Sequence, residues 1–488
     1  MATSVTGTGS ISSAGIGSGL DVNSIVTSLM AVEKRPLTQL QTQATQLAAR
    51  LSTVGKMQGY FSALQSRANA LTSPALWSST LASSSDSAAV KVSTGTDATP
   101  GNYSVAVSRL AVGQTVTGSA LASSSSALGA GTLTITLGRY DGGAPPTQFT
   151  GKAGVAPISL SIGAGESSLG ALRDKINGAG AGVSATLVSD ASGTRLSLRS
   201  KDSGAENAFR IGVTETNDDG NAATGLSALA FDATDAGSPM LRTASAGNAE
   251  LTVNGIALSS ASNTLTNVVD GLTLSLQKTT STDVDVNVAA DTASVKTALT
   301  GFVEAFNNLA GFIRTQTAYN ADSKTSGALQ GDQATLALQS QMRAVLNEGS
   351  SASATWSRLS DIGLALKSDG TLETKDSKLD NALGNLGELK KLLATDGASS
   401  AGSGFARRFK RLSDAALGTD GVFQSRTDSI QASVSRNGKS QDSMQRRLTL
   451  TEARMRAQYS ALDTTMAGLS SLSTYMTQQI SLSNKSGV

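Results

Sequence analysis

Residues 448–480 read LTLTEARMRAQYSALDTTMAGLSSLSTYMTQQI, and a heptad pattern in this stretch decides the fold. Its first apolar row repeats every seven positions and consists of Leu448, Met455, Leu462, Leu469 and Met476. A second row runs beside it, with apolar residues at Tyr459, Met466 and Ile480 and interruptions at Glu452 and Ser473. An apolar stripe with this period predicts a long helix that buries one face against another helix.

The N-terminal region carries a matching pattern. Asp21 is predicted to cap a short helix. The apolar residues that follow it at helical spacing are Ile25, Val26, Leu29, Met30 and Val32. Pro36 then ends that helix or opens the next one in its first turn. A second heptad row follows and stops near residues 73–74; its members are Leu40, Leu47, Val54, Phe61 and Ala68. Neither terminal helix can bury its stripe alone, so the sequence predicts that the two pair antiparallel.

The middle of the chain, from about residue 78 to residue 290, has the period of strands instead. Apolar and polar residues alternate in segments 103–107, 133–137, 158–162, 183–187, 196–198, 251–253, 272–276 and 284–288. Asn254-Gly255 predicts a tight hairpin, and residues 190–193 predict a longer hairpin loop. One short helix is predicted over Leu169, Leu172 and Ile176, and the small-residue stretches 123–126 and 233–247 are predicted to be loops or linkers.

A third helical block follows, with helices predicted over 295–313, 336–346 and 379–393. The predicted fold is therefore a multidomain α+β protein: an antiparallel coiled-coil stalk or bundle from both chain ends, with inserted β-rich head domains. We expect residues 1–40 and 450–488 to form terminal coiled-coil legs that are disordered before assembly. Residues 41–77 and 290–449 then form a helical bundle domain, and residues 78–289 form two β-rich head domains.

Composition excludes several functions. Among 488 residues there is no histidine and no cysteine, which argues against Zn sites and against catalytic triads or dyads that use either residue. A net charge of +2 favours neither nucleic acid nor an acidic membrane surface. The first 20 residues have neither a basic region nor an apolar region, so we expect no Sec signal peptide. The sequence has no apolar run of about 18 residues, so we expect no membrane-spanning helix. We therefore predict no enzyme activity, no cofactor and no metal.

Two short motifs resemble functional sites and fail on their spacing. Residues 438–440 end like a phosphate-binding loop, but the glycine required five residues earlier is Ser433. Residues 215–220 begin like a calcium loop, but its twelfth position is Leu226 instead of glutamate, so a solvated loop is predicted. The basic residues of segment 405–456 predict a solvated helical face with some pairing between subunits.

Several ordered segments resemble one family. Residues 15–37 (GIGSGLDVNSIVTSLMAVEKRPL) and 454–480 resemble the two ends of the flagellar filament cap, also called hook-associated protein 2. The segments FVEAFNNL, GALQGDQATLALQSQMR and DGTLETKDSKLDNAL match the same family between those ends. Residues 158–211 resemble the IN motif of flagellin-like proteins.

The resemblance implies a mechanism. A cap of this family is exported unfolded through the flagellar type III channel and forms a ring-like homo-oligomer at the distal tip of the filament. Its helical legs contact the filament, its β-rich heads form a plate, and flagellin folds and inserts beneath it. Implied partners are flagellin, other hook-associated proteins and an export chaperone. Two alternatives stay open: an adhesin that binds host glycans or mucin through the β head, and a hook–filament junction protein.

The residues expected to carry this function are apolar positions of the two terminal stripes, which would pair the legs and dock them on flagellin or neighbouring subunits. They are Ile25, Leu29, Leu40, Leu47, Val54, Leu448, Met455, Leu462, Leu469 and Met476.

Overall fold

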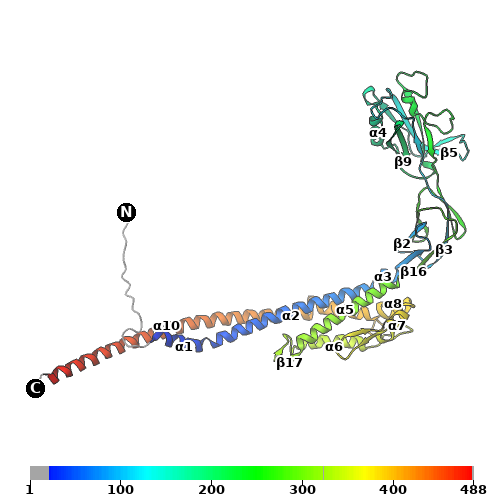
Figure 1. Ribbon diagram of the computed structural model, residues 1–488. Helices are drawn as coiled ribbons and strands as arrows, with labels where there is room; N and C mark the ends of the chain where they lie inside the picture. Colours follow the sequence, from blue (N-terminus) through cyan, green and yellow to red (C-terminus); the bar gives the residue numbers. More distant parts are fainter. Residues whose placement is uncertain (1–20, 323, 486–488) are drawn as a thin grey trace, which may run out of the picture. The chain divides into compact units, whose positions relative to one another are not determined.

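The computed structural model describes residues 21–322 and 324–485, so residues 1–20 and 486–488 of the legs expected to be disordered before assembly lie outside the described part. The chain divides into two units, one made of Met1–Leu76 with Thr292–Val488 and one made of Trp77–Asp291 (Figure 1). Helices dominate the first unit and antiparallel strands dominate the second, which confirms the predicted α+β class. Among the described residues, no helix is both long and apolar enough to cross a membrane.

The first unit is built from helices that both ends of the chain supply. Their bounds are α1 Val22–Glu33, α2 Arg35–Thr72, α5 Thr292–Thr317, α6 Gln333–Asn347, α7 Asp376–Leu383, α8 Leu386–Ala394, α9 Phe405–Leu417 and α10 Val422–Lys485, with α3 Pro74–Ser78 at the boundary between the units. Two small hairpins add β17 Tyr319–Asn320 with β18 Thr325–Ser326, and β19 Leu364–Leu366 with β20 Leu372–Thr374. A short 3₁₀ helix, η4, covers Leu359–Ile362.

Local signals in the sequence place the first two helices. The Asp21 carboxylate accepts a hydrogen bond from the backbone N–H of Ser24 at 3.0 Å, so it caps α1 as predicted. Proline has no N–H to donate, and Pro36 sits in the first turn of α2, where no helical acceptor is needed. α2 ends at Thr72, just before Ser73 and Pro74, as the end of the apolar pattern predicted.

α2 and α10 pair antiparallel, as predicted. The rings of Phe61 and Phe423 pack edge to face with centroids 5.1 Å apart, near the start of α10. Farther along α10, the Asn437 side chain contacts Gln43. The pair runs side by side over most of the length of α2 (Figure 1).

The wider part of the first unit has an aromatic core. α5 and α9 both pack on α2, and Phe409 of α9 lies 5.3 Å from Phe302 and 5.8 Å from Phe306, ring centroid to ring centroid. All three rings are buried, and edge-to-face geometry adds to the stabilisation that burial gives. The predicted helices over 295–313 and 336–346 are confirmed as α5 and α6.

The single helix predicted over 379–393 is wrong. α7 ends at Leu383, and α8 starts again at Leu386. The Asn385 side chain accepts a hydrogen bond from the N–H of Glu388 at 3.3 Å and so caps α8. An asparagine that competes for helical N–H groups favours a new start over continuation.

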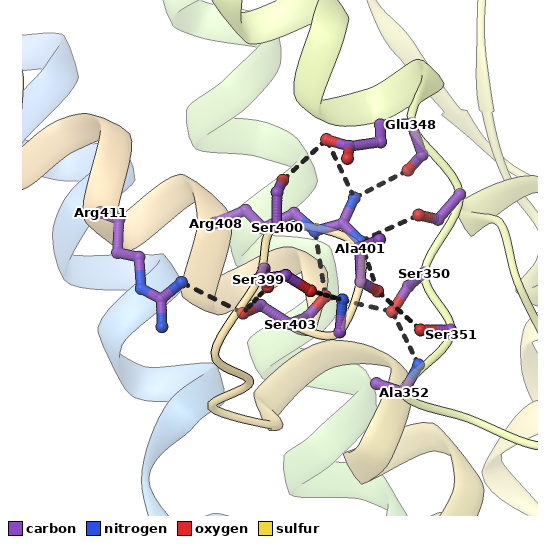
Figure 2. A network of polar contacts seen from close by, with 12 residues as sticks. Glu348, Ser350, Ser351, Ala352, Ser399, Ser400, Ala401, Ser403, Arg408 and Arg411 are labelled. Carbon is purple, nitrogen blue, oxygen red and sulfur yellow. Dashed lines mark hydrogen bonds and ion pairs between the residues drawn. The ribbon is translucent and has the colours of Figure 1, made fainter.

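A buried arginine of α9 holds two loops together (Figure 2). Arg408 is 4% exposed, so the predicted solvated face is wrong at this residue. Its Nη1 donates to the Glu348 carbonyl at 2.8 Å, and its Nη2 donates to the carbonyls of Gly349 and Ala401 at 3.0 and 3.2 Å. Its Nε donates to the Ser403 carbonyl at 3.0 Å. Burial lowers the pKa of this guanidinium, and the Glu348 carboxylate at 3.8 Å opposes that shift.

The second unit contains two separate hydrophobic cores, and the first lies between a five-stranded and a three-stranded antiparallel sheet. The five-stranded sheet has the order β1 Thr80–Ser84, β16 Val284–Ala290, β3 Gly101–Arg109, β12 Ala249–Val253 and β13 Ile256–Ser260. The other sheet has the order β14 Thr264–Val269, β15 Leu272–Leu276 and β2 Val90–Thr94. The Asn254-Gly255 hairpin is confirmed: both residues have positive φ, 50° and 78°, as a type I′ turn requires.

The second core lies between two further antiparallel sheets and one helix. In one sheet β5 Gly131–Tyr140 pairs with β6 Phe149–Gly151, β7 Ile158–Ile162 and β10 Ala208–Glu215. The other sheet has the order β11 Leu241–Ala244, β4 Thr115–Thr117, β9 Gly193–Ser200 and β8 Val183–Asp190. The predicted short helix is confirmed as α4, Leu169–Gly178, and short 3₁₀ turns cover η1 Ala164–Glu166, η2 Ala205–Asn207 and η3 Leu226–Leu229.

Two details of the loops differ from the prediction. Asp190 pairs directly with Gly193, so the hairpin between β8 and β9 has two loop residues instead of a longer loop. Gly193 has a φ of +124°, a conformation that glycine adopts without strain. The predicted linker 233–247 contains β11, because the free edge of β4 offers backbone partners to a segment that has no apolar alternation of its own.

Candidate assembly surface

The two terminal helices α1 and α10 form a thin seam with its own small core. Val22, Val26 and Met30 of α1 are buried against Leu448 of α10. The partly buried residues around this cluster are Leu37, Met444, Met455 and Tyr459. Arg456 fixes the outer end of the seam, because its guanidinium donates to the Asn23 side chain at 3.0 Å and pairs with Glu452 at 2.8 Å.

The structure places the expected residues of α1 at the edge of this seam. Ile25 is half-buried, and Leu29 is 39% exposed. The buried stripe consists instead of residues four positions apart, Val22, Val26 and Met30. Both stripes have helical spacing in the sequence, so periodicity alone did not distinguish the face that meets α10 from its neighbour.

Burial along α2 follows the number of helices around it. Val54 is fully buried where α2 packs on the bundle, whereas Leu40 and Leu47 are half-buried nearer the chain end. Two helices alone cannot enclose a broad apolar face, because each covers only one side of the other. The thin part of the stalk therefore leaves apolar edges in contact with water.

The apolar row of α10 continues past the seam and becomes exposed. Met455 is half-buried, but Leu462 is 46% exposed, Leu469 is 61% exposed and Met476 is 55% exposed. Further exposed apolar residues widen this face, namely Met466, Leu472 and Ile480. We call these six residues from Leu462 to Ile480 the outer face of α10. A contiguous apolar surface of this kind indicates a contact with another helix or protein.

The outer face is almost free of charge. Between residues 457 and 480, Asp463 is the only charged residue in the sequence. The polar side of this helix consists of hydroxyl groups that donate to backbone carbonyls of the preceding turn, for example Thr474 to Ser470 and Thr477 to Ser473, at 2.9 and 2.8 Å. A partner at this surface would therefore be held by burial of apolar area, with little dependence on salt.

The structure places the two motif-like segments as follows. Residues 438–440 lie inside α10, so they cannot form the loop between a strand and a helix that binds phosphate. Glu215, Asp218 and Asp219 have carboxylate oxygens within 4.8 Å of one another. Asp219 accepts a hydrogen bond from the Thr224 hydroxyl at 2.7 Å, which lowers its pKa, and Glu215 accepts one from Ser227 N–H at 2.5 Å. These acids therefore have partners within their own loop.

A helical pair made from both chain ends, β domains inserted between them and an exposed apolar helix define a subunit built for assembly. Comparison with known families identifies which kind. The model described as "Flagellar hook-associated protein 2 C-terminus" matches residues 246–471, and its N-terminal counterpart matches residues 18–114. The model described as "Flagellin hook IN motif" matches residues 148–202, which overlaps the segment that resembled this motif.

Relatives and solved structures agree with these matches. Flagellar hook-associated protein 2 of Escherichia coli (strain K12) is 31% identical over 488 residues, which cover 96% of this chain and 98% of that protein. B-type flagellar hook-associated protein 2 of Pseudomonas aeruginosa is 30% identical, covering 92% of this chain and 93% of that protein. The crystal structure of the D1-D2-D3 domains of the flagellar cap protein FliD from Escherichia coli aligns with a TM-score of 0.58 at 30% identity, over 78% of this chain and 99% of that one.

This chain therefore belongs to the flagellar hook-associated protein 2 family, the flagellar filament cap proteins. The family is one of structural components of the flagellum.

Proposed function

We propose that this chain is exported from the cell and caps the distal tip of a flagellar filament, where it promotes the folding and insertion of flagellin. The observation that carries the proposal is the outer face of α10. The heptad row that buries Leu448 against α1 continues through Leu462, Leu469 and Met476 without a described helix to cover it. A structural subunit that presents such a row needs a further α-helix to cover it. In this proposal the subunits at the end of the filament supply that α-helix.

The free energy available at this face suits a reversible contact. Full burial of a Leu or Met side chain contributes about 1.5–3 kcal/mol, and the three row residues Leu462, Leu469 and Met476 are about half exposed. Their burial therefore contributes roughly 2–5 kcal/mol per leg. One leg alone binds weakly, but several legs of one ring-like oligomer bind together with much higher avidity. A cap held in this way can release one leg and keep the others attached while a subunit inserts.

The remaining roles follow from this proposal. Residues 1–40 and 450–488 act as legs, residues 41–77 and 290–449 as the bundle that carries them, and residues 78–289 as two head domains. The partners are further copies of this chain, flagellin, other hook-associated proteins and an export chaperone. Ile25, Leu29, Leu40 and Leu47 line exposed or half-buried edges of the stalk, which supports a role in contacts between subunits.

Charge placed on the outer face tests the proposal. In a strain whose own cap gene is deleted, the double variant Leu469→Glu with Met476→Glu should secrete flagellin into the medium and build few filaments. The matched control, Ser471→Glu with Gln478→Glu, adds the same charge to exposed positions on the opposite side of the same helix. Normal filaments with the first variant, or equal loss with both, would rule out docking through this face.

The position of the chain on the filament needs a separate measurement. Electron microscopy of filaments from cells with a labelled copy should show the label at distal tips only. If the label lies along the filament or at its junction with the hook, the chain is a filament or junction subunit instead of a cap.

A further inference from the structure

One layer of the interface between α2 and α10 is polar. The α10 residues in this interface recur every seven positions at Phe423, Ile430, Asn437 and Met444, and only Asn437 in this row is polar. Asn437 is 8% exposed, and the two residues before it in the row are buried apolar side chains. A polar residue in this position loses contact with water without adding apolar burial, so it requires a role of another kind.

The polar layer consists of Gln43, Asn437 and Gln441. The Gln441 side-chain amide donates to Asn437 Oδ1 at 2.6 Å and to the backbone carbonyl of Leu40 at 3.5 Å. The Asn437 amide in turn donates to Gln43 Oε1 at 3.5 Å. The layer thus links α10 to α2 at one level of the stalk, between the bundle and the α1 seam.

The Phe61–Phe423 contact favours the observed register at the bundle end, but in the thin part of the stalk the apolar row of α10 does not fix the register by itself. Leu448, Met455, Leu462, Leu469 and Met476 are similar in size and spaced by seven. A slip of α10 by one heptad in one direction would put Met455 in the place of the buried Leu448, at little cost in buried area, whereas the opposite slip would put Gln441 there. Such a slip would also change how much of α10 extends beyond α1.

The polar layer distinguishes these registers. A slip of seven residues in one direction places Asn437 opposite Pro36, which has no polar side chain and no N–H group. A slip in the other direction places Gln43 opposite Met444 and Asn437 opposite Arg50. Either slip separates the buried Asn437 amide from Gln43, and a buried amide without its partner, as in the slip that places Asn437 opposite Pro36, is disfavoured.

We propose that the polar layer sets the register of α2 against α10 and thereby the length of the outer face left free for docking. Gln43, Asn437 and Gln441 are positioning residues in this proposal: they contact no partner and determine which α10 residues a partner meets. The consequence for docking rests on the proposed cap function, but the register itself is measurable on the purified chain.

Crosslinking tests the register directly, because the chain has no cysteine of its own. Asn23 and Arg456 are in contact, so the pair Asn23→Cys with Arg456→Cys reports the observed register through a short thiol-to-thiol crosslinker. The pairs Asn23→Cys with Thr449→Cys, and Asn23→Cys with Asp463→Cys, report slips of one heptad in either direction. With the natural polar layer, only the first pair should crosslink efficiently within one chain.

In the background Gln43→Leu with Asn437→Leu, the ratio of slipped to native crosslinks should rise by roughly tenfold or more, because the apolar layer no longer discriminates between registers. The matched control Thr42→Leu with Ser440→Leu adds leucines at exposed neighbouring positions and should keep the natural pattern. Asn437→Leu alone serves if the double variant does not fold, and circular dichroism checks the helix content of each variant.

If every folded variant with leucine in the polar layer still crosslinks only between positions 23 and 456, the proposal is wrong. Slipped register together with normal filaments in cells would instead leave the register function intact and contradict docking through the outer face. The two proposals therefore fail on different measurements.

Discussion

Arg408 offers a sharp test of how the bundle is stabilised. Replacement by methionine keeps a long apolar stem and removes the guanidinium that donates to four backbone carbonyls. Two of those carbonyls keep other donors: Ser403 accepts from the Ser350 hydroxyl, and Ala401 accepts from Ser351. The carbonyls of Glu348 and Gly349 would lose the donor that Arg408 supplies.

The size of the effect follows from those two carbonyls. A hydrogen bond from a charged donor contributes about 1.5–3 kcal/mol, so the loss of these two bonds in Arg408→Met should lower the free energy of unfolding of the helical unit by about 3 kcal/mol. The packing of the guanidinium on the Phe405 ring, 4.9 Å from its centroid, is lost as well. For a unit of this size, the expected drop in the melting temperature is roughly 6–12 °C.

Thermal unfolding followed by circular dichroism at the helix signal measures this change, and hydrogen exchange locates it. Exchange should accelerate first in residues 348–353 and 395–404, the two segments that Arg408 holds. Lys410→Met is the matched control, because Lys410 lies on the same helix and makes only a partly exposed ion pair with Asp414, worth at most about 1 kcal/mol. A loss below about 0.5 kcal/mol in Arg408→Met, or an equal loss in both variants, would refute the assignment of the network as a stabilising clamp.

Three further outcomes are expected. Asp21→Ala removes the cap of α1 and should destabilise that helix by about 1 kcal/mol, seen as faster hydrogen exchange in Val22–Glu33 only; unchanged exchange there would contradict the capping role. Hydrogen bonds from Lys391, Ser353 and Ala354 lower the pKa of Glu388 to about 2, so its stabilising effect is present above its ordinary pKa of 4.5 and disappears as the pH falls toward 2. Melting temperatures of the natural chain and Glu388→Gln should therefore differ at pH 6 and converge near pH 2, and a difference that grows with acid would reverse this sign. Deletion of residues 1–34 removes α1 and uncovers Leu448, so cells with this variant should release flagellin into the medium; full filaments would show that α1 is dispensable.

Much of the secondary structure was predictable from local pattern. The helices α2, α4, α5, α6 and α10, the Asp21 cap and the Asn254-Gly255 hairpin follow from apolar period, capping residues and turn residues. The strands β1, β2 and β10 were not among the predicted alternating segments, although their residues alternate in burial for part of their length. Strands depend on the neighbours they pair with, so a weak alternation becomes a strand only when a free edge is available.

The candidate surface was predictable as a stripe, but the extent of its burial was not. The same heptad row contains a buried Leu448, a half-buried Met455 and an exposed Leu469. The sequence contains no signal that separates these positions, because each is a similar apolar residue in the same register. These positions differ because α1 covers Leu448 and ends before it reaches Leu469. Where α1 meets α10 depends in turn on the pairing of helices along the whole stalk. The polar layer did have a signal, an asparagine seven residues after Ile430 and seven before Met444.

By itself the sequence determined the periods: seven at both chain ends, two in the middle, and with them an antiparallel helical stalk around inserted β domains. Periodicity is a property of neighbouring residues, so it can be read without knowledge of their partners. Only the tertiary structure decided which apolar residues of α1 face α10, namely Val26 but not Leu29, and that Arg408 is buried among carbonyls. These outcomes depend on groups far away in the sequence that supply the covering surface or the hydrogen-bond acceptors, and no local pattern encodes them.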